Sequence, residues 1–279
     1  MLLQPATIFD SAKDEGWRVV DILALAGTLL LVAVALYYRQ IFGGQTFVWR
    51  DHLVYTWPSR QLLFEAMRSH ALREWNDLIG LGTQFAASSA NGVAYPPLWL
   101  VALPLPLGMD LTIVVHVVLA GAGTSLFARR LGASKLGGLF AGAALMSCGY
   151  VASIAPNKVF ISAAWLPLVA WAADRVAVSE AGRRRVFDAL VLAAIVAFQL
   201  LGGDPAASIA TGLVVLGVIL ARSTQRPAAL LWTAVAYALA VLLAAVGVLP
   251  SLALLPHTKP HGAELRGGHH LVVAPVAPC

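Results

Sequence analysis

The chain has 279 residues, of which 59% are hydrophobic and 12% are charged, and its formal net charge is +5. A soluble globular domain is typically about 45–50% apolar and about 25% charged, so the composition excludes an ordinary soluble domain and favours a polytopic membrane protein. The positive charge does not indicate a nucleic-acid partner, because no basic stripe is interleaved with stacking aromatic residues. Its simpler source is the excess of Lys and Arg in the cytoplasmic loops of membrane proteins.

Apolar runs long enough to cross a bilayer define the predicted organisation. Residues 1–18 form a mixed-charge segment, and residues 19–39 a first transmembrane helix, since about 20 apolar residues cross the hydrocarbon core. Residues 40–107 form a long polar loop, which ends in a proline-rich segment too short to span. Residues 108–250 form a helical bundle, and residues 251–279 a polar tail that we expect to be disordered. Six further spans, about seven in all, are predicted at 110–128, 136–155, 159–178, 186–201, 206–221 and 228–249.

Charge predicts how these spans are oriented. The short connections on one side of the bundle carry most of its basic residues, namely Arg129, Arg130, Lys135, Arg175, Arg183, Arg184, Arg185, Arg222 and Arg226. The short turns on the other side carry only Lys158. The positive-inside rule therefore places the basic side and the N-terminus in the cytoplasm and the 40–107 loop outside. The chain ends soon after its last outward span, so we expect a truncated member of its family.

Few polar groups are predicted inside the spans. No Asp, Glu, Lys or Arg lies near the middle of a span, and Asp110, Asp174 and Asp188 lie near span ends, where charge reaches water. A charge at a helix centre costs about 2.5–3.5 kcal/mol on insertion scales, so its absence argues against proton-coupled transport and ion conduction. We expect His116 and Gln199 to form interhelical hydrogen bonds. The spacing Gly138-x-x-x-Gly142 predicts a close helix contact.

The chemistry is therefore expected in the outer loop, which concentrates the charged residues. A helix is predicted from Thr56 to about Ser69, with Pro58 in its first turn, where proline is tolerated. We expect Trp57, Phe64 and Met67 to face the membrane, and Arg60, Glu65 and Arg68 to face water. Glu65 and Arg68 are expected to pair. The aromatic residues that suit an interfacial loop are Trp49, Trp57, Trp75, Tyr95 and Trp99.

Asp51 is the strongest candidate for a catalytic group in this loop. It follows the first span and stands between Arg50 and His52. Residue type alone leaves two simpler interpretations open: a solvated charge paired with Arg50, or a cap for the following helix. Asp77 has a similar alternative, in which it only stabilises a turn.

A family resemblance favours the catalytic interpretation. The segment Trp75–Phe85, WNDLIGLGTQF, followed by Tyr95-Pro96-Pro97, resembles the first outer loop of YfhO-type bacterial membrane proteins, which belong to the GT-C superfamily of polytopic glycosyltransferases. Phe47–Asp51, FVWRD, resembles the start of that loop, where an Asp follows the first span. His116 with Ala120-Gly121, and then Trp165-Leu166-Pro167, continue the pattern in order. Gly202–Pro205 resembles a Gly-His-Pro-type turn, with Asp204 in place of the histidine. The resemblance extends to about Pro256.

The resemblance implies an all-α, GT-C-like integral membrane bundle in a bacterial inner membrane, with an outward loop containing short interfacial helices. It implies transfer of a sugar from a polyprenyl-phosphate donor to an envelope glycan or lipid acceptor, and possible use of a divalent metal, Mg²⁺ or Mn²⁺. Asp51 is then the predicted catalytic base. The predicted substrate-binding residues are Arg50, His52, Arg60, Glu65, Asn76, Asp77, Lys158 and Asp204. The alternative is a non-catalytic membrane scaffold or a lipid or polymer export component.

Overall fold

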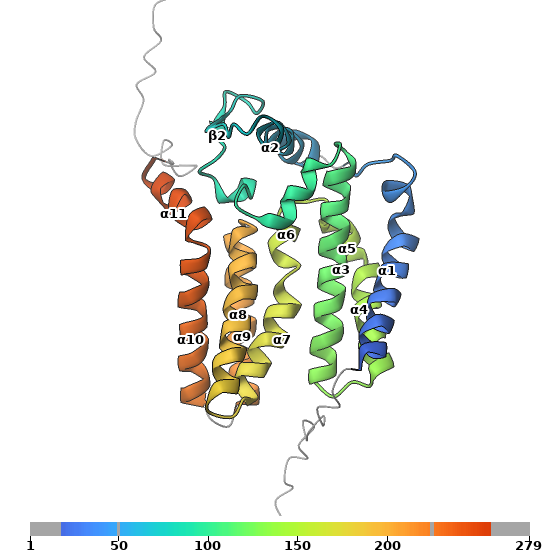
Figure 1. Ribbon diagram of the computed structural model, residues 1–279, viewed down its shortest axis with the longest axis vertical. Helices are drawn as coiled ribbons and strands as arrows, with labels where there is room; N and C mark the ends of the chain where they lie inside the picture. Colours follow the sequence, from blue (N-terminus) through green and yellow to red (C-terminus); the bar gives the residue numbers. More distant parts are fainter. Residues whose placement is uncertain (1–17, 49–50, 224–225, 258–279) are drawn as a thin grey trace, which may run out of the picture.

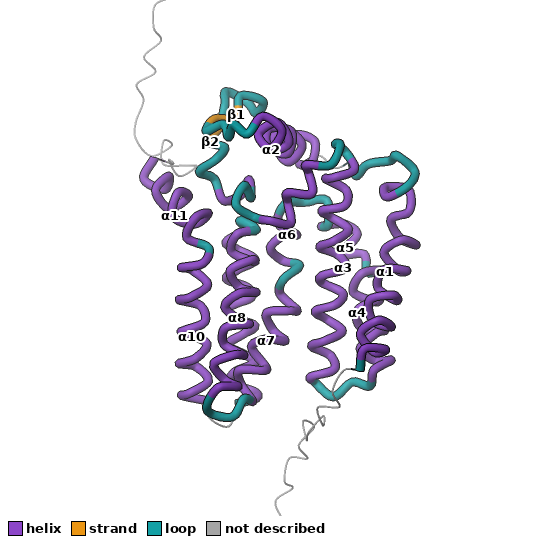
Figure 2. The backbone as a smooth tube through the Cα atoms, in the orientation of Figure 1, coloured by secondary structure: helices purple, strands orange, loops and turns teal. Residues whose placement is uncertain are grey.

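The computed structural model describes residues 18–48, 51–223 and 226–257, and most of this chain is helical, as the sequence predicts. Upright helices lie side by side, and α2 and the small β1–β2 hairpin lie across one end (Figures 1 and 2). The upright helices are α1 (Val19–Ile41), α3 (Leu107–Arg130), α4 (Lys135–Ser147), α5 (Gly149–Ile154), α6 (Val159–Ala163), α7 (Leu166–Val178), α8 (Arg183–Leu201), α9 (Pro205–Arg222) and α10 (Arg226–Leu243). At the loop end lie η1 (His52–Thr56), α2 (Trp57–Ser69), β1 (Trp75–Asn76), β2 (Thr83–Gln84), η2 (Ser89–Asn91), η3 (Pro96–Ala102), α11 (Ala245–Leu254) and η4 (Leu255–His257).

Several of these helices are suited to a membrane. In the described chain, 4 helices are long and apolar enough to cross one: α1, α3, the combined α6–α7 segment and α9. A fifth is reached if α10 and α11, which meet at a bend of 77°, count as one broken span. Much of the apolar surface of α1 and α9 is exposed, and large exposed apolar surfaces mark contact with a membrane or another protein. The structure therefore supports a membrane-embedded helical protein, with fewer clear spans than the predicted seven.

Two predicted spans differ from the helices observed. The span expected at 136–155 is divided at Cys148, whose extended backbone separates α4 from α5. The last span is interrupted after Leu243 and continues as α11, which passes through Pro250 and ends at Leu254. Regular structure thus continues into the segment that was expected to be a disordered tail, and residues 258–279 lie outside the described chain.

Small residues bring α3 and α4 into close contact, as the glycine spacing predicts. A Cβ atom on Gly142 would lie 2.1 Å from the Ser125 hydroxyl oxygen and 2.5 Å from the Gly121 carbonyl oxygen. A Cβ atom on Gly138 would lie 3.0 Å from the Ser125 carbonyl oxygen. Any larger side chain at Gly142 would push the two helices apart, so this pair of glycines sets their separation.

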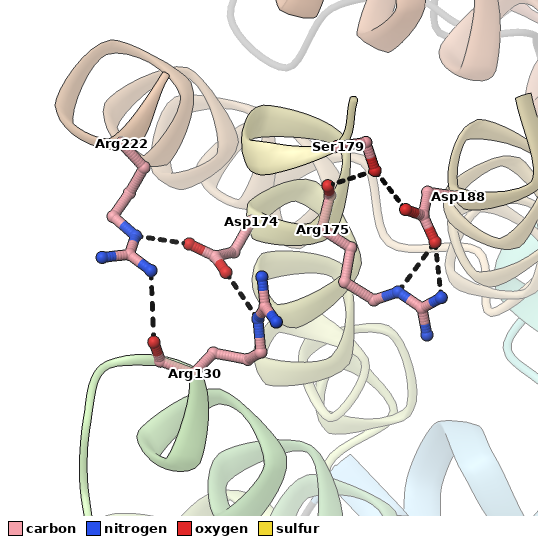
Figure 3. Close-up of polar contacts among 6 residues, drawn as sticks. All are labelled: Arg130, Asp174, Arg175, Ser179, Asp188 and Arg222. Carbon is pink, nitrogen blue, oxygen red and sulfur yellow. Dashed lines mark hydrogen bonds and ion pairs between the residues drawn. The ribbon is translucent and has the colours of Figure 1, made fainter. Parts of the chain in front are cut away.

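Ion pairs join the helices at the end opposite the loop (Figure 3). The carboxylate of Asp174 on α7 accepts hydrogen bonds from Nε of Arg130 on α3, at 2.7 Å, and from Nε of Arg222 on α9, at 2.6 Å. Asp188 on α8 accepts from Nε of Arg175 at 2.8 Å and from the Ser179 hydroxyl. The expectation that these span-end carboxylates reach water was wrong, because both are buried and their arginine partners replace the solvent.

The loop end is fixed to the bundle by a buried aromatic group. The Tyr95 hydroxyl lies 2.7 Å from Nε2 of His116 on α3 and accepts a hydrogen bond from the Trp165 indole N–H, also at 2.7 Å. Because Nδ1 of His116 lies 2.6 Å from the Thr112 carbonyl oxygen, that nitrogen carries the proton and Nε2 accepts from Tyr95. The hydrogen bond expected to join His116 to another helix instead joins it to Tyr95, the residue of the loop that precedes η3. Tyr95, however, is fully buried inside the protein, whereas it was expected at the membrane–water interface.

A second contact holds the loop against the other half of the bundle. The Ser251 hydroxyl on α11 donates to the Ala87 carbonyl oxygen at 2.8 Å and accepts from the Ser89 N–H at 2.6 Å. Gly203, in the turn before α9, has a φ of +85°, and a Cβ atom there would lie 2.0 Å from the Ser89 carbonyl oxygen. Only glycine allows this approach, so the α8–α9 turn and α11 together support the loop.

Candidate functional site

A small cavity lies where the loop meets the bundle. Its walls come from η1, α2, η3, the loop end of α3, and the turn from Ala155 to Lys158. Its polar lining residues are His52, Thr56, Arg60, Thr112, Asn157 and Lys158. The cavity volume of about 20 Å³ is sufficient for one or two water molecules but not for a sugar.

His52 lines this cavity, and its side chain carries an unsatisfied nitrogen. Its side chain is buried, and its Nδ1 lies 3.0 Å from the Pro156 carbonyl oxygen, so Nδ1 carries a proton. Its Nε2 is buried and has no hydrogen-bond partner. Burial is the main reason that the pKa of His52 lies below its usual value, and the nearby Arg60 charge adds to this effect. The neutral form therefore leaves an Nε2 lone pair without a donor.

Arg60 contributes a buried positive charge to the same cavity. Its side chain is only 3% exposed, and its guanidinium donates to the Asn91 carbonyl oxygen. Among the described residues it forms no ion pair with a carboxylate. Desolvation lowers the pKa of Arg60 to about 10, so it remains charged near neutral pH. The expectation that Arg60 faces water was wrong: α2 buries Ser59, Arg60, Leu63 and Ala66 on the face toward the bundle.

Lys158 lines the cavity, and two carboxylates influence its charge. Partial burial, followed by the charge of Arg60, lowers the pKa of Lys158, whereas Asp204 and Asp51 act in the opposite direction. Both carboxylates are thus close enough to Lys158 for their charges to be felt. Asp204 also caps α9, since its Oδ1 accepts from the Ala207 N–H at 2.7 Å. Asp51 is half-buried at the start of η1, directly before His52, and its side chain does not cap the helix.

The remaining predicted substrate-binding residues are outside the cavity lining. Glu65 accepts from Gln61 and pairs with Arg73 at 4.0 Å, not with Arg68 as expected. The guanidinium of Arg68 instead lies 5.4 Å from the centre of the Phe64 ring.

Asn76 and Asp77 occupy the hairpin of the loop, and their contacts are structural. Asn76 is fully buried, and its Oδ1 accepts from the Leu78 N–H, which stabilises the turn. Asp77 forms an exposed pair with Arg73 at 3.6 Å. The turn-stabilising residue is therefore Asn76, its neighbour in the sequence.

Two further predictions concern Arg50 and a metal ion. Arg50 lies outside the described residues. Within residues 18–48, 51–223 and 226–257, no group of three or more His, Cys, Asp or Glu side chains is arranged to hold a metal ion. The charged side chains that line the described cavity are Arg60 and Lys158.

Asp110 is a buried residue of the loop end that the sequence analysis did not single out as a candidate. Its Oδ1 accepts from the Thr46 hydroxyl at 2.9 Å and from the Phe47 N–H at 3.3 Å, and its Oδ2 has no partner. It thus holds the segment that leads from α1 toward Asp51. An acidic residue in the first turn of a helix is common because it interacts favourably with the helix dipole, so no local pattern indicated that Asp110 is buried.

Together, the fold and this cavity define a membrane-type helical protein with a cationic site beneath its loop. The chain was compared with family models, curated proteins and solved structures, and none of them matches.

Proposed function

We propose that this protein is a membrane glycosyltransferase of the GT-C type, which transfers a sugar from a polyprenyl-phosphate donor to an envelope glycan or lipid outside the cytoplasm. The observation that carries the proposal is the buried Arg60 guanidinium, which has no carboxylate partner among the described residues and shares a cavity with the vacant Nε2 of His52. A buried cation is costly unless something compensates its charge. An anionic group held at the loop end would provide that compensation, and a donor phosphate fits this requirement.

The proposed reaction assigns separate roles to Asp51 and the basic residues. A hydroxyl oxygen of the acceptor attacks the anomeric carbon of the donor sugar, while the bond from that carbon to the phosphate oxygen breaks. The carboxylate of Asp51 takes the hydroxyl proton, a form of assistance typically worth about 10²–10⁴ in rate. Arg60 and Lys158 stabilise the negative charge on the departing polyprenyl phosphate.

The size of the cavity supports the alternative, a non-catalytic scaffold or export component. A water-sized space cannot hold the sugar and phosphate together, so turnover requires η1 and α2 to move away from the bundle. A protein that only binds a lipid headgroup at its surface would need a smaller movement. The two functions are therefore distinguished by product formation and not by binding alone.

The test uses the full chain in lipid nanodiscs with polyprenyl-phosphate hexoses and pentoses and a mixture of envelope glycan and lipid acceptors. Product is measured with Mg²⁺, with Mn²⁺ and with a chelator. We expect Asp51→Asn to lower kcat by about 10²-fold or more, because it removes the base without changing side-chain size. The matched control is Glu74→Gln, an exposed carboxylate of the same loop. Equal rates for Asp51→Asn and the wild type would remove Asp51 as the base. No turnover with any donor would favour the scaffold.

A further inference from the structure

His52 and Arg60 form a site with two properties that do not usually occur together. Both side chains are more than nine-tenths buried, and both line the same cavity. One is a fixed cation, and the other is a neutral imidazole with a vacant nitrogen. Buried polar groups in folded proteins are normally satisfied, so the vacant nitrogen calls for a ligand that is able to pair with it.

The orientation of the imidazole decides what that ligand must provide. Nδ1–H donates to the Pro156 carbonyl oxygen, so this bond holds the ring and leaves Nε2 directed away from it. A neutral His52 offers only a lone pair at Nε2, which an anion cannot use. A protonated His52 offers an N–H donor, which an anionic oxygen accepts strongly.

From this geometry we infer that binding of a phosphate-type anion at this site, which requires η1 and α2 to move and widen the water-sized cavity, is coupled to the uptake of one proton by Nε2 of His52. The inference deepens the proposed function, because it concerns the same site and rests on it. The proton comes from bulk water and adds to Nε2, no covalent bond of the ligand changes, and the proton returns to water when the anion leaves. His52 thereby acts as a pH-dependent ligand beside the permanent charge of Arg60.

The surroundings of His52 determine the direction of the effect. Facing the cavity, α2 contributes Arg60, the turn before α6 contributes Lys158, and α3 contributes the uncharged Met109, Thr112 and Ile113. Asp204 and Asp51 act on the charge of Lys158. Without an anion, burial and Arg60 keep the pKa of His52 below its usual value, so the His52 side chain is neutral near pH 7. A bound anion raises that pKa, so affinity is highest at acidic pH and falls as the pH rises between the two pKa values.

The experiment measures binding, and it does not depend on turnover. Two phosphodiesters are used, because each remains a monoanion across the pH range: soluble dimethyl phosphate and a polyprenyl-phosphate hexose incorporated in nanodiscs. Calorimetric titrations of the full chain at about pH 5.5, 6.5, 7.5 and 8.5, each in two buffers of different ionisation enthalpy, give both the Kd and the number of protons taken up. We expect the Kd to rise by up to about tenfold per pH unit within the transition, with uptake approaching one proton. Binding of the lipid diester alone identifies the source as a headgroup presented by the membrane.

Two variants separate His52 from other titrating groups. His52→Asn keeps an amide N–H able to bond the Pro156 carbonyl oxygen but has no titratable nitrogen, and we expect it to abolish both the pH slope and the proton uptake. The matched control is His70→Asn, which alters an exposed histidine at the end of α2 and should leave both unchanged. If His52→Asn does not fold, the imidazole NMR signals of His52 in the wild type, titrated with and without the diester, report its protonation directly, and an unchanged His52 titration on binding would overturn its role.

The possible failures are distinguishable. Binding without proton uptake, or uptake that persists in His52→Asn, would overturn the role of His52 and leave the proposed function standing. Absence of binding by both diesters at every pH would overturn the anion site, and the proposed function would lose its main support.

Discussion

Asp174 provides the most direct test of how the helices are held together at the end of the bundle opposite the loop. Its side chain is 0% exposed, and its two oxygens each accept from an arginine Nε, of Arg130 and of Arg222. Asp174→Asn keeps the shape of the side chain but removes the charge and leaves one oxygen to serve two donors. The change therefore leaves two arginine side chains, 20% and 14% exposed, with incomplete compensation.

The magnitude follows from this burial. Breaking a fully buried ion pair costs about 3–5 kcal/mol, and the partial exposure of both arginines lets water recover some of that cost, which gives about 2–4 kcal/mol here. At roughly 2–4 °C per kcal/mol for a chain of this size, Tm should fall by roughly 4–16 °C. The assay is thermal unfolding of purified protein in a single detergent, followed by circular dichroism.

The control for this prediction is another Asp–Arg pair of the same chain. Asp77 and Arg73 form a pair whose side chains are 65% and 54% exposed, and such pairs contribute little. Asp77→Asn should therefore change Tm by no more than about 1–2 °C. In addition, Arg222→Gln should cost less in the Asp174→Asn background than in the wild type, because the two residues interact. Equal Tm values for Asp174→Asn and Asp77→Asn would refute the reasoning.

Two further predictions concern contacts between elements. Gly142→Leu should lower the free energy of unfolding by about 1–3 kcal/mol or more, because even a Cβ atom there would meet Ser125 and Gly121. Thermal unfolding in detergent measures this change, and an unchanged Tm would contradict the close contact between α3 and α4. Ser251→Ala removes the hydroxyl that joins α11 to the loop at Ser89. Limited proteolysis within the loop should then become faster, while the helix content stays constant. An unchanged cleavage rate would show that this contact does not hold the loop.

The sequence was sufficient for the features that depend on local composition and periodicity. The apolar runs predicted the helical class and most of the helices, and the position of Pro58 located the start of α2. The Gly138–Gly142 spacing predicted the close contact of α4 with α3, because small residues one turn apart lie on one face of a helix. These properties arise within one segment, so a single sequence reports them.

The burial of charge could not be predicted in this way. Arg60 occurs in an amphipathic pattern that equally suits a water-facing side chain, and it is buried only because α2 packs against η3, next to the turn at Pro156. Likewise Asp174 lies at a predicted span end, where water was expected, and its partners come from α3 and α9, which are distant in the sequence. A charge is stable in such positions only when distant residues replace its solvation, and no local pattern records which residues they are.

By itself, the sequence determined that this protein is a bundle of apolar helices with a charged loop at one end, because hydrophobic periodicity and length act within each segment. The tertiary structure decided which loop charges became a site. It brought His52, Arg60 and Lys158 to one cavity and left Glu65 and Asp77 outside it, since long-range packing selects the side chains that lose contact with water.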